Sequence, residues 1–126
     1  MENNDMELVA TDSHSGILEY EASIISDTKA LGKFYSRINK TRKPGLSAPS
    51  IDFSKNTLLV ICMGEQNGTE KPLLKKTEDK DNVLITIELP EYLDNAPNKE
   101  TFTSYPFYIY KLPHTSKTVN IQKSGF

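Results

Sequence analysis

One cysteine and two histidines carry the most reactive side chains in this sequence. Cys62 lies inside an apolar run, and His14 and His114 stand one hundred positions apart. A thiol beside an imidazole base forms a nucleophile pair, and histidines with cysteines or carboxylates bind metal ions. Neither histidine has such a partner at ligand spacing, and a thiol between Ile61 and Met63 is typical of an inert core residue. We therefore expect no catalytic residue, no metal site and no cofactor.

A glycine-bounded segment, GEQNG at residues 64–68, follows the apolar run directly. A phosphate-binding loop would continue into a helix and would supply a lysine followed by serine or threonine. Here Lys71 is followed by proline and by strand-like residues. We interpret the segment as a turn between strands, since Asn-Gly is a frequent turn dipeptide. Its candidate binding residues are Glu65, Asn67 and Gly68.

The segment YPFYIYKL, residues 105–112, reads as a strand rich in aromatic side chains. If Phe107 faces the core, Tyr105, Tyr108 and Tyr110 would lie half exposed and would suit contacts with a protein or a sugar. Alternatively, the tyrosines only cover the second face of the sheet, as cross-strand aromatic pairs commonly do. The three tyrosines are candidate binding residues on the first interpretation.

Composition limits the class of protein. The chain has 126 residues, a net charge of −2 and a single cysteine, which indicates one domain without an internal disulfide and without bulk attraction to nucleic acid. No apolar run approaches the length that a membrane span needs, and the first residues lack the pattern of an export signal. A trimmed export signal would leave the same sequence, so these features leave both a periplasmic or cell-surface location and a cytoplasmic one open.

Periodicity predicts the first elements. Residues 1–16 read as a flexible polar arm or a short edge strand, and the alternation in residues 17–25 predicts a half-buried strand. A helix is predicted from Thr28 to Asn39, with Ser26 or Asp27 as its N-cap. Its apolar residues recur at helical spacing and are Leu31, Phe34, Tyr35 and Ile38.

The second half of the chain reads as strands. Residues 57–63 are apolar on both alternate faces, which predicts a central strand covered on both sides. Residues 73–77 and 82–89 predict a hairpin, residues 90–104 a long connection, and residues 118–123 a last strand. The fold class is therefore α+β and mainly β, an antiparallel sheet, small barrel or sandwich of about six strands with one packed helix. Residues 17–126 form a single domain in this interpretation.

Several short motifs resemble the C-terminal domain of the protease complex subunit PrcB family, over roughly residues 24–123. The matching features are Asp52, Phe53, Ser54, Lys55, Gly64, Glu65 and, in outline, the strand at 106–113. Where the family tends to have two glycines and a tyrosine, this chain has Gly-Thr-Glu-Lys at 68–71, so that step is altered. The resemblance implies a non-catalytic accessory subunit of a secreted or surface protease complex in bacteria.

Two functions follow as expectations. The first is a non-enzymatic protein-binding or accessory module of the bacterial cell envelope, with a protein partner that the resemblance suggests is an extracellular protease complex. The alternative is a small-ligand or carbohydrate-binding domain that uses the aromatic strand. Neither involves nucleic acid or a membrane span.

Overall fold

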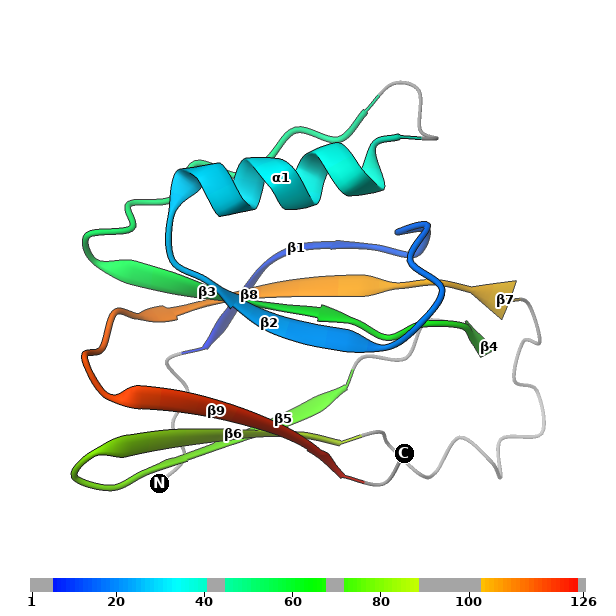
Figure 1. Ribbon diagram of the computed structural model, residues 1–126. Helices are drawn as coiled ribbons and strands as arrows, with labels where there is room; N and C mark the ends of the chain where they lie inside the picture. Colours follow the sequence, from blue (N-terminus) through cyan, green and yellow to red (C-terminus); the bar gives the residue numbers. More distant parts are fainter. Residues whose placement is uncertain (1–5, 41–44, 68–71, 89–102, 125–126) are drawn as a thin grey trace.

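The computed structural model describes residues 6–40, 45–67, 72–88 and 103–124, and they form three layers (Figure 1). Helix α1 (Thr28–Ile38) lies over one face of a four-stranded sheet, and a three-stranded sheet lies against the other face. The fold is α+β and mainly β, as the sequence predicts, and among its alternatives the open sandwich is correct because the sheets do not close into a barrel.

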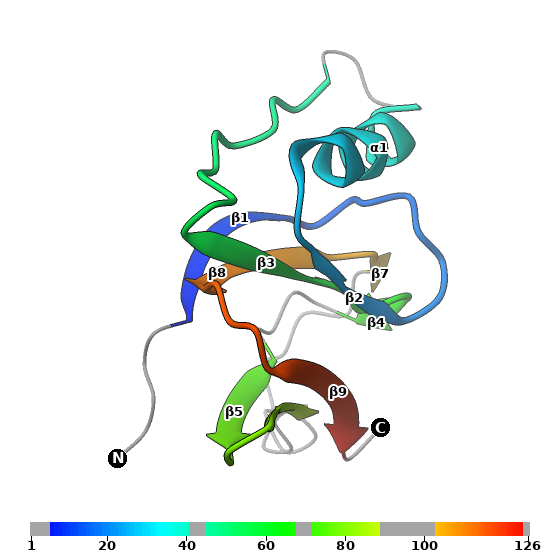
Figure 2. The ribbon, with the colours of Figure 1, turned by 60° about the vertical axis from the view of Figure 1, so that its left-hand side comes forward.

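The four-stranded sheet is antiparallel throughout. Its strands, in spatial order, are β1 (Glu7–Asp12), β8 (Phe107–Pro113), β3 (Asn56–Cys62) and β2 (Glu21–Ile25). The three-stranded sheet contains β5 (Leu73–Glu78), β6 (Asn82–Glu88) and β9 (Thr118–Ser124), and a short pair joins β4 (Gln66–Asn67) to β7 (Thr103–Ser104). Strands β1 and β2 are thus the two edges of the larger sheet (Figure 2).

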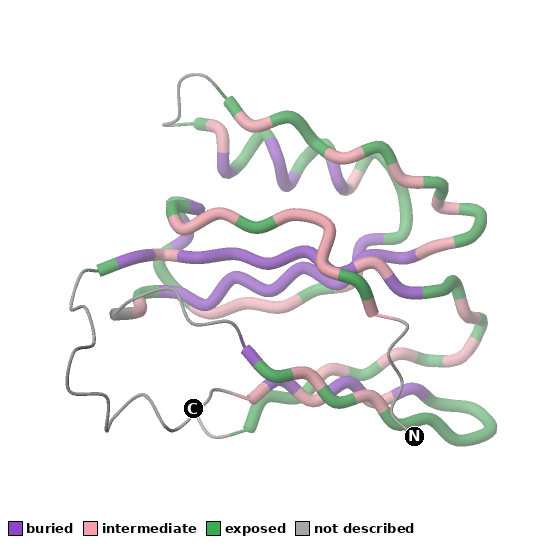
Figure 3. Tube along the Cα trace, turned by 180° about the vertical axis from the view of Figure 1, so that it is seen from behind, coloured by how far each residue is buried: buried purple, intermediate pink, exposed green. Residues whose placement is uncertain are grey.

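Strand β3 lies in the interior of the sheet with both faces buried, which confirms the prediction for residues 57–63 (Figure 3). Alternate side chains belong to two different cores because successive residues of a strand point to opposite faces. Leu58, Val60 and Cys62 pack in the core beneath α1. Leu59 and Ile61 pack in the core shared with the three-stranded sheet.

Helix α1 begins and ends close to its predicted limits. Asp27 is the N-cap, and its Oδ1 accepts a hydrogen bond of 2.7 Å from the backbone N–H of Ala30. The four predicted apolar residues are buried, and the ring of Phe34 meets that of Phe107 edge to face at 5.5 Å between centroids. Burial of each such side chain stabilises the fold by about 1.5–3 kcal/mol, which holds α1 against the sheet.

The first predicted strand is shorter than expected. Residues 17–25 were expected to form one strand, but β2 begins only at Glu21, and Leu18 is 67% exposed although the alternation placed it on the buried face. The reason lies in β3, whose last residue, Cys62, pairs with Glu21. Strand β3 ends there, and Gly64 follows with φ 74°, so residues 18–20 have no β3 residue with which to pair.

The last strand corrects the expectation of a wholly antiparallel sheet. Residues 73–78 and 82–88 form the predicted antiparallel hairpin, closed by Asp79, but β9 runs parallel to β6. The segment after β8 carries the chain from one sheet to the other, so β9 meets β6 rather than returning along β8. Val119 and Ile121 of β9 pack against the core between the sheets.

Candidate functional site

The structure does not present the predicted row of half-exposed tyrosines. Tyr108 is only 3% exposed and Tyr110 only 7%, because the three-stranded sheet covers that face of β8. Burial also raises the pKa of Tyr110. Tyr105 is half-buried, and its backbone bridges to His14. The tyrosines therefore cover the second face of the sheet, which was the other interpretation of this strand.

The residues of the predicted turn lie apart from those tyrosines. Glu65 is exposed, and Asn67 belongs to β4, where it pairs with Thr103, two residues before Tyr105. Gly68 lies outside the described residues. The structure therefore brings Asn67 near the chain segment of Tyr105 but does not gather the predicted binding residues into one site.

The reactive side chains are likewise separated. Cys62 is 1% exposed, and burial raises the pKa of its thiol to about 12. His14 and His114 are both exposed, and they lie in different segments of the surface. Within the described ranges, no group of three histidine, cysteine or acidic residues is placed to hold a metal ion. No described helix has the length and apolar character that a membrane span requires.

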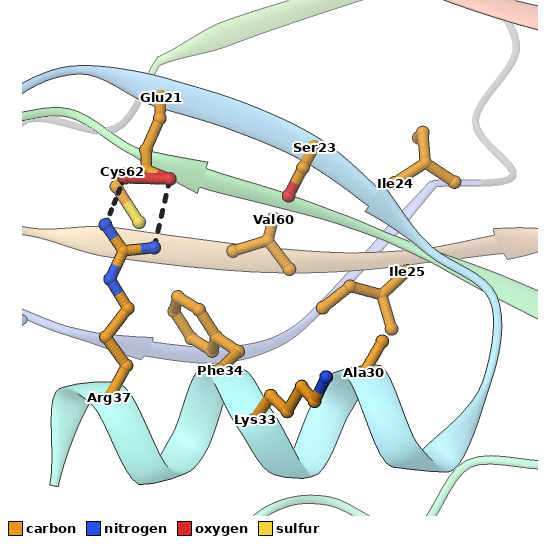
Figure 4. A pocket seen from close by; sticks show the side chains of 10 residues that line it. All are labelled: Glu21, Ser23, Ile24, Ile25, Ala30, Lys33, Phe34, Arg37, Val60 and Cys62. Atoms are coloured by element: carbon orange, nitrogen blue, oxygen red, sulfur yellow. Dashed lines mark hydrogen bonds and ion pairs between the residues drawn. The ribbon is translucent and has the colours of Figure 1, made fainter.

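A concave surface lies between β2 and α1, and we call it the β2–α1 groove (Figure 4). Its volume is about 310 Å³, and an adjoining hollow of about 540 Å³ extends it toward residues 15–19. Its principal lining residues are Glu21, Ser23 and Ile25 of β2, Lys33 and Arg37 of α1, and Cys62 of β3. The adjoining hollow shares Glu21 and Arg37 and adds Lys40.

The short link between β2 and α1 produces this groove. Ser26 and Asp27 are the only residues between the two elements, so α1 turns back and runs alongside β2 in the opposite direction (Figure 1). On the helix, Phe34 points to the core, Arg37 reaches across to β2, and the side chain of Lys33 lies along the helix toward Ala30 and lines the groove (Figure 4). A basic helical stripe therefore faces an edge strand across the groove.

Glu21 and Arg37 form an ion pair across the groove. Nη1 of Arg37 donates a hydrogen bond of 3.1 Å to Oε1 of Glu21, and Nη2 donates a second bond to Oε2. Paired bonds of this kind fix the orientation of both groups, because the planar guanidinium matches the carboxylate. Cys62 lies beside the pair, at the end of β3 (Figure 4). The pair thus covers the thiol within the groove. The same two residues also line the adjoining hollow, so they form the border between the groove and the hollow.

The backbone edge of β2 borders the same groove. On one side β2 pairs with β3 over its whole length, from Glu21 to Ile25. On its other side no described strand pairs with it. An edge strand presents unpaired N–H and C=O groups on that side, which are able to pair with another extended chain.

Gly64 supports the entry to β2. A Cβ at this position would lie 2.8 Å from the backbone nitrogen of Tyr20, a distance that real Cβ atoms do not reach. Its φ of 74° also favours glycine. The sequence predicts a bend at this glycine, and the structure shows that the same residue lets the chain approach closely just before β2.

Periodicity in the sequence did not reveal this groove. It identified the outward positions of residues 17–25 and of the helix only as solvent-facing. One signal was available, because Lys33 and Arg37 recur at i and i+4 in a helix without acidic residues and Lys40 follows shortly after its end. Their position opposite an edge strand depends on the tertiary packing of α1, which periodicity does not give.

The fold and the groove define a three-layer domain with an open strand edge beside a basic helix. Comparisons of the chain with models of protein families, with curated proteins and with solved structures found no match. The resemblance to the PrcB family stays a prediction from the sequence.

Proposed function

We propose that this protein is a non-catalytic binding module that accepts an extended polypeptide segment as an additional strand along β2. The observation that carries the proposal is the regular edge of β2, with which no strand of the described residues pairs, beside the β2–α1 groove. In strand addition, backbone hydrogen bonds supply affinity, and a neighbouring groove supplies specificity through alternate side chains. Here α1 forms the wall against which those side chains would pack.

The class of partner follows from the sequence. The PrcB-like motifs imply an accessory subunit, so the proposed partner is a protein of a secreted or surface protease complex in the bacterial cell envelope. The absence of catalysis is supported by the burial of Cys62, whose thiol has a pKa raised to about 12. It is also supported by the exposed positions of both histidines, whereas the thiol is buried.

The carbohydrate-binding alternative is not favoured by an observation of this kind. It relied on exposed aromatic rings, and Tyr108 and Tyr110 are buried between the two sheets. Tyr105 remains as a half-buried ring. A single partly covered ring does not make the rigid exposed platform that sugar contacts require.

Selection from a displayed library of random heptapeptides tests the mode of binding. We expect selected peptides to slow amide hydrogen exchange in β2 and to lose binding in Ser23→Tyr, which fills the groove with a bulky neutral side chain. Asn120→Tyr is the matched control, since Asn120 is an exposed residue on the edge strand β9 of the other sheet. Peptides that bind Ser23→Tyr as tightly as the wild-type protein would overturn the proposal.

A second experiment tests the class of partner. Wild-type protein and the same two variants are used to capture proteins from a bacterial envelope extract, with identification by mass spectrometry. We expect a protease subunit to be recovered with wild-type protein and Asn120→Tyr but not with Ser23→Tyr. Recovery of no protease, or equal recovery with all three proteins, would contradict the proposed partner class.

A further inference from the structure

Helix α1 directs an excess of positive charge toward the β2–α1 groove. Lys33 and Arg37 line the groove, and Lys40 lines the adjoining hollow. Residues 28–40 contain four basic residues and no aspartate or glutamate. A helix face exposed only to solvent commonly carries charges of both signs. The groove therefore has one wall of a single sign, in a chain whose net charge is −2.

The carboxylate that meets this wall comes from the edge strand itself. Glu21 binds Arg37 through both of its oxygens. Neither Lys33 nor Lys40 forms an ion pair within the part of the chain that the structure describes. Two of the three cations are thus available to an incoming carboxylate, and the third is held by a residue of β2.

The spacing of these cations suits an added strand. Side chains on the same face of a strand recur about every 6.7 Å. Positions i and i+4 of a helix are separated by about 6 Å along its axis, and this is the relation between Lys33 and Arg37. Because α1 runs alongside β2 in the opposite direction (Figures 1 and 4), alternate residues of a strand added to β2 would follow the row of cations.

We infer that the added strand of the proposed function carries carboxylates at alternate positions, which Lys33, Arg37 and Lys40 bind. This inference rests on the strand addition proposed above. Glu21 occupies Arg37 in the free protein and acts as an internal competitor, so binding requires that Arg37 exchange the carboxylate of Glu21 for one of the ligand. The ligand class is an acidic extended polypeptide.

The groove favours a polypeptide over other anions. The edge of β2 offers backbone hydrogen bonds that only another extended backbone satisfies along its length. Phosphate or a nucleic acid would use the cations alone, and the net charge of the chain gives no general attraction to polyanions. The combination of a pairable edge with a basic wall therefore identifies acidic peptide strands as the ligand.

Three synthetic peptides test the inference, with the sequences TEVEVET, TQVQVQT and TKVKVKT. Each exposed charge pair contributes a factor of about two to five in affinity, so calorimetric titration at low salt should show TEVEVET binding roughly tenfold more tightly than TQVQVQT. TKVKVKT should bind most weakly. The preference for the acidic peptide should shrink in high salt, because exposed charges are screened.

Protein variants assign the effect to individual residues. Lys33→Gln and Lys40→Gln should each weaken binding of TEVEVET about twofold to fivefold. Lys80→Gln removes the same charge from an exposed lysine at the tip of the β5–β6 hairpin and should leave affinity unchanged. Glu21→Gln should strengthen binding of the acidic peptide, because the internal competitor is gone. An unchanged or lower affinity in Glu21→Gln would contradict the competitor role.

Hydrogen exchange separates failure of this inference from failure of the proposed function. If TQVQVQT and TEVEVET bind equally and both protect β2 amides, strand addition stands and recognition of carboxylates is wrong. If none of the peptides protects β2, both proposals fail. Protection of β2 that rises with protein concentration in the absence of peptide would identify a second copy as the occupant and would overturn the inference. Equal competition by inorganic phosphate would overturn it as well.

Discussion

Strands β1 and β2 are the two edges of the same sheet, yet they offer different surfaces to a neighbour. The register of β1 against β8 shifts between Leu8 and Ala10, and such irregularities twist an edge away from further pairing. Strand β2 keeps an unbroken register from Glu21 to Ile25 and has α1 as a wall beside it. The difference shows that one edge is protected by its backbone geometry, whereas the other stays regular and bordered by a groove.

The largest expected effect is on the rate at which the Cys62 thiol is alkylated, which tests how firmly β2 is attached to β3. Cys62 pairs with Glu21, whose ion pair with Arg37 covers the thiol within the groove, so the thiol becomes accessible if this pair opens or the start of β2 separates. The pKa of the thiol is raised from 9.0 to about 12, which lowers the thiolate fraction at pH 8 by about a thousandfold. We expect iodoacetamide to alkylate Cys62 in the native protein more slowly, by about that factor, than it alkylates the free thiol of glutathione. Mass spectrometry follows both reactions.

Protein unfolded in urea is the control for that measurement and should react as fast as glutathione. Alkylation of the native protein at a comparable rate would mean that Glu21, at the first position of β2, moves readily away from the thiol. The comparison of the two edges would then be wrong, because β2 would not be the firmly held edge.

The second prediction compares the two described glycines with positive φ. Gly16 precedes β2 in the chain, and Gly64 lies against residues 18–20, just before β2. Gly64→Ala should lower the free energy of unfolding by about 3 kcal/mol, since a strained φ is combined with a Cβ 2.8 Å from the Tyr20 nitrogen. Gly16→Ala has a similar φ of 79° but nothing within 4 Å of the new Cβ. It should cost about 1 kcal/mol. Urea denaturation measures both values, and equal losses would show that close approach to residue 20 is unimportant.

The third prediction tests the wall that distinguishes β2 from β1. Asp27→Ala should lower the free energy of unfolding by about 1 kcal/mol, because the N–H of Ala30 loses its acceptor at the start of α1. Asp27→Asn keeps an acceptor at the same place and should retain most of the stability. Thermal or chemical denaturation would decide, and equal losses in the two variants would indicate that the cap does not stabilise α1.

The smallest effects are expected for the two ion pairs at the sheet edges. Glu21 pairs with Arg37 beside β2, and Glu7 pairs with Lys111 beside β1 at 3.6 Å. Both pairs are partly exposed, so Glu21→Gln and Glu7→Gln should each change the free energy of unfolding by less than about 1 kcal/mol. Only Glu21→Gln should alter peptide binding. If Glu7→Gln changed the affinity for the acidic peptide as much as Glu21→Gln does, the two edges would not differ in peptide binding.

Much of the fold followed from periodicity, whereas the candidate site did not. The helix and the central strand were predictable because Leu31, Phe34 and Ile38 recur with a helical period and residues 57–63 are apolar on both faces. The parallel partner of β9 was not predictable, since period-two alternation is the same in either direction of pairing. The shorter β2 depended on where β3 ends, which its own alternation does not record.

The tyrosines show the same limit. Alternation placed Tyr108 and Tyr110 on one face of a strand, but it did not show that a second sheet would cover that face. Conversely, Glu21 and Arg37 are sixteen positions apart and meet only because α1 turns back along β2. Contacts between elements decide both outcomes, and a single sequence does not specify them.

The parallel pairing of β6 with β9 has a consequence for the order of folding. Hairpin β5–β6 joins neighbouring residues and can form within microseconds, but β9 reaches β6 only after the chain has passed through β8. During that interval one backbone edge of β6 is unpaired. The apolar side chains of Val83, Ile85 and Ile87 are also not yet fully buried. We expect newly made or refolding chains to aggregate through this strand at high concentration, and early pairing of β9 with β6 to reduce that aggregation.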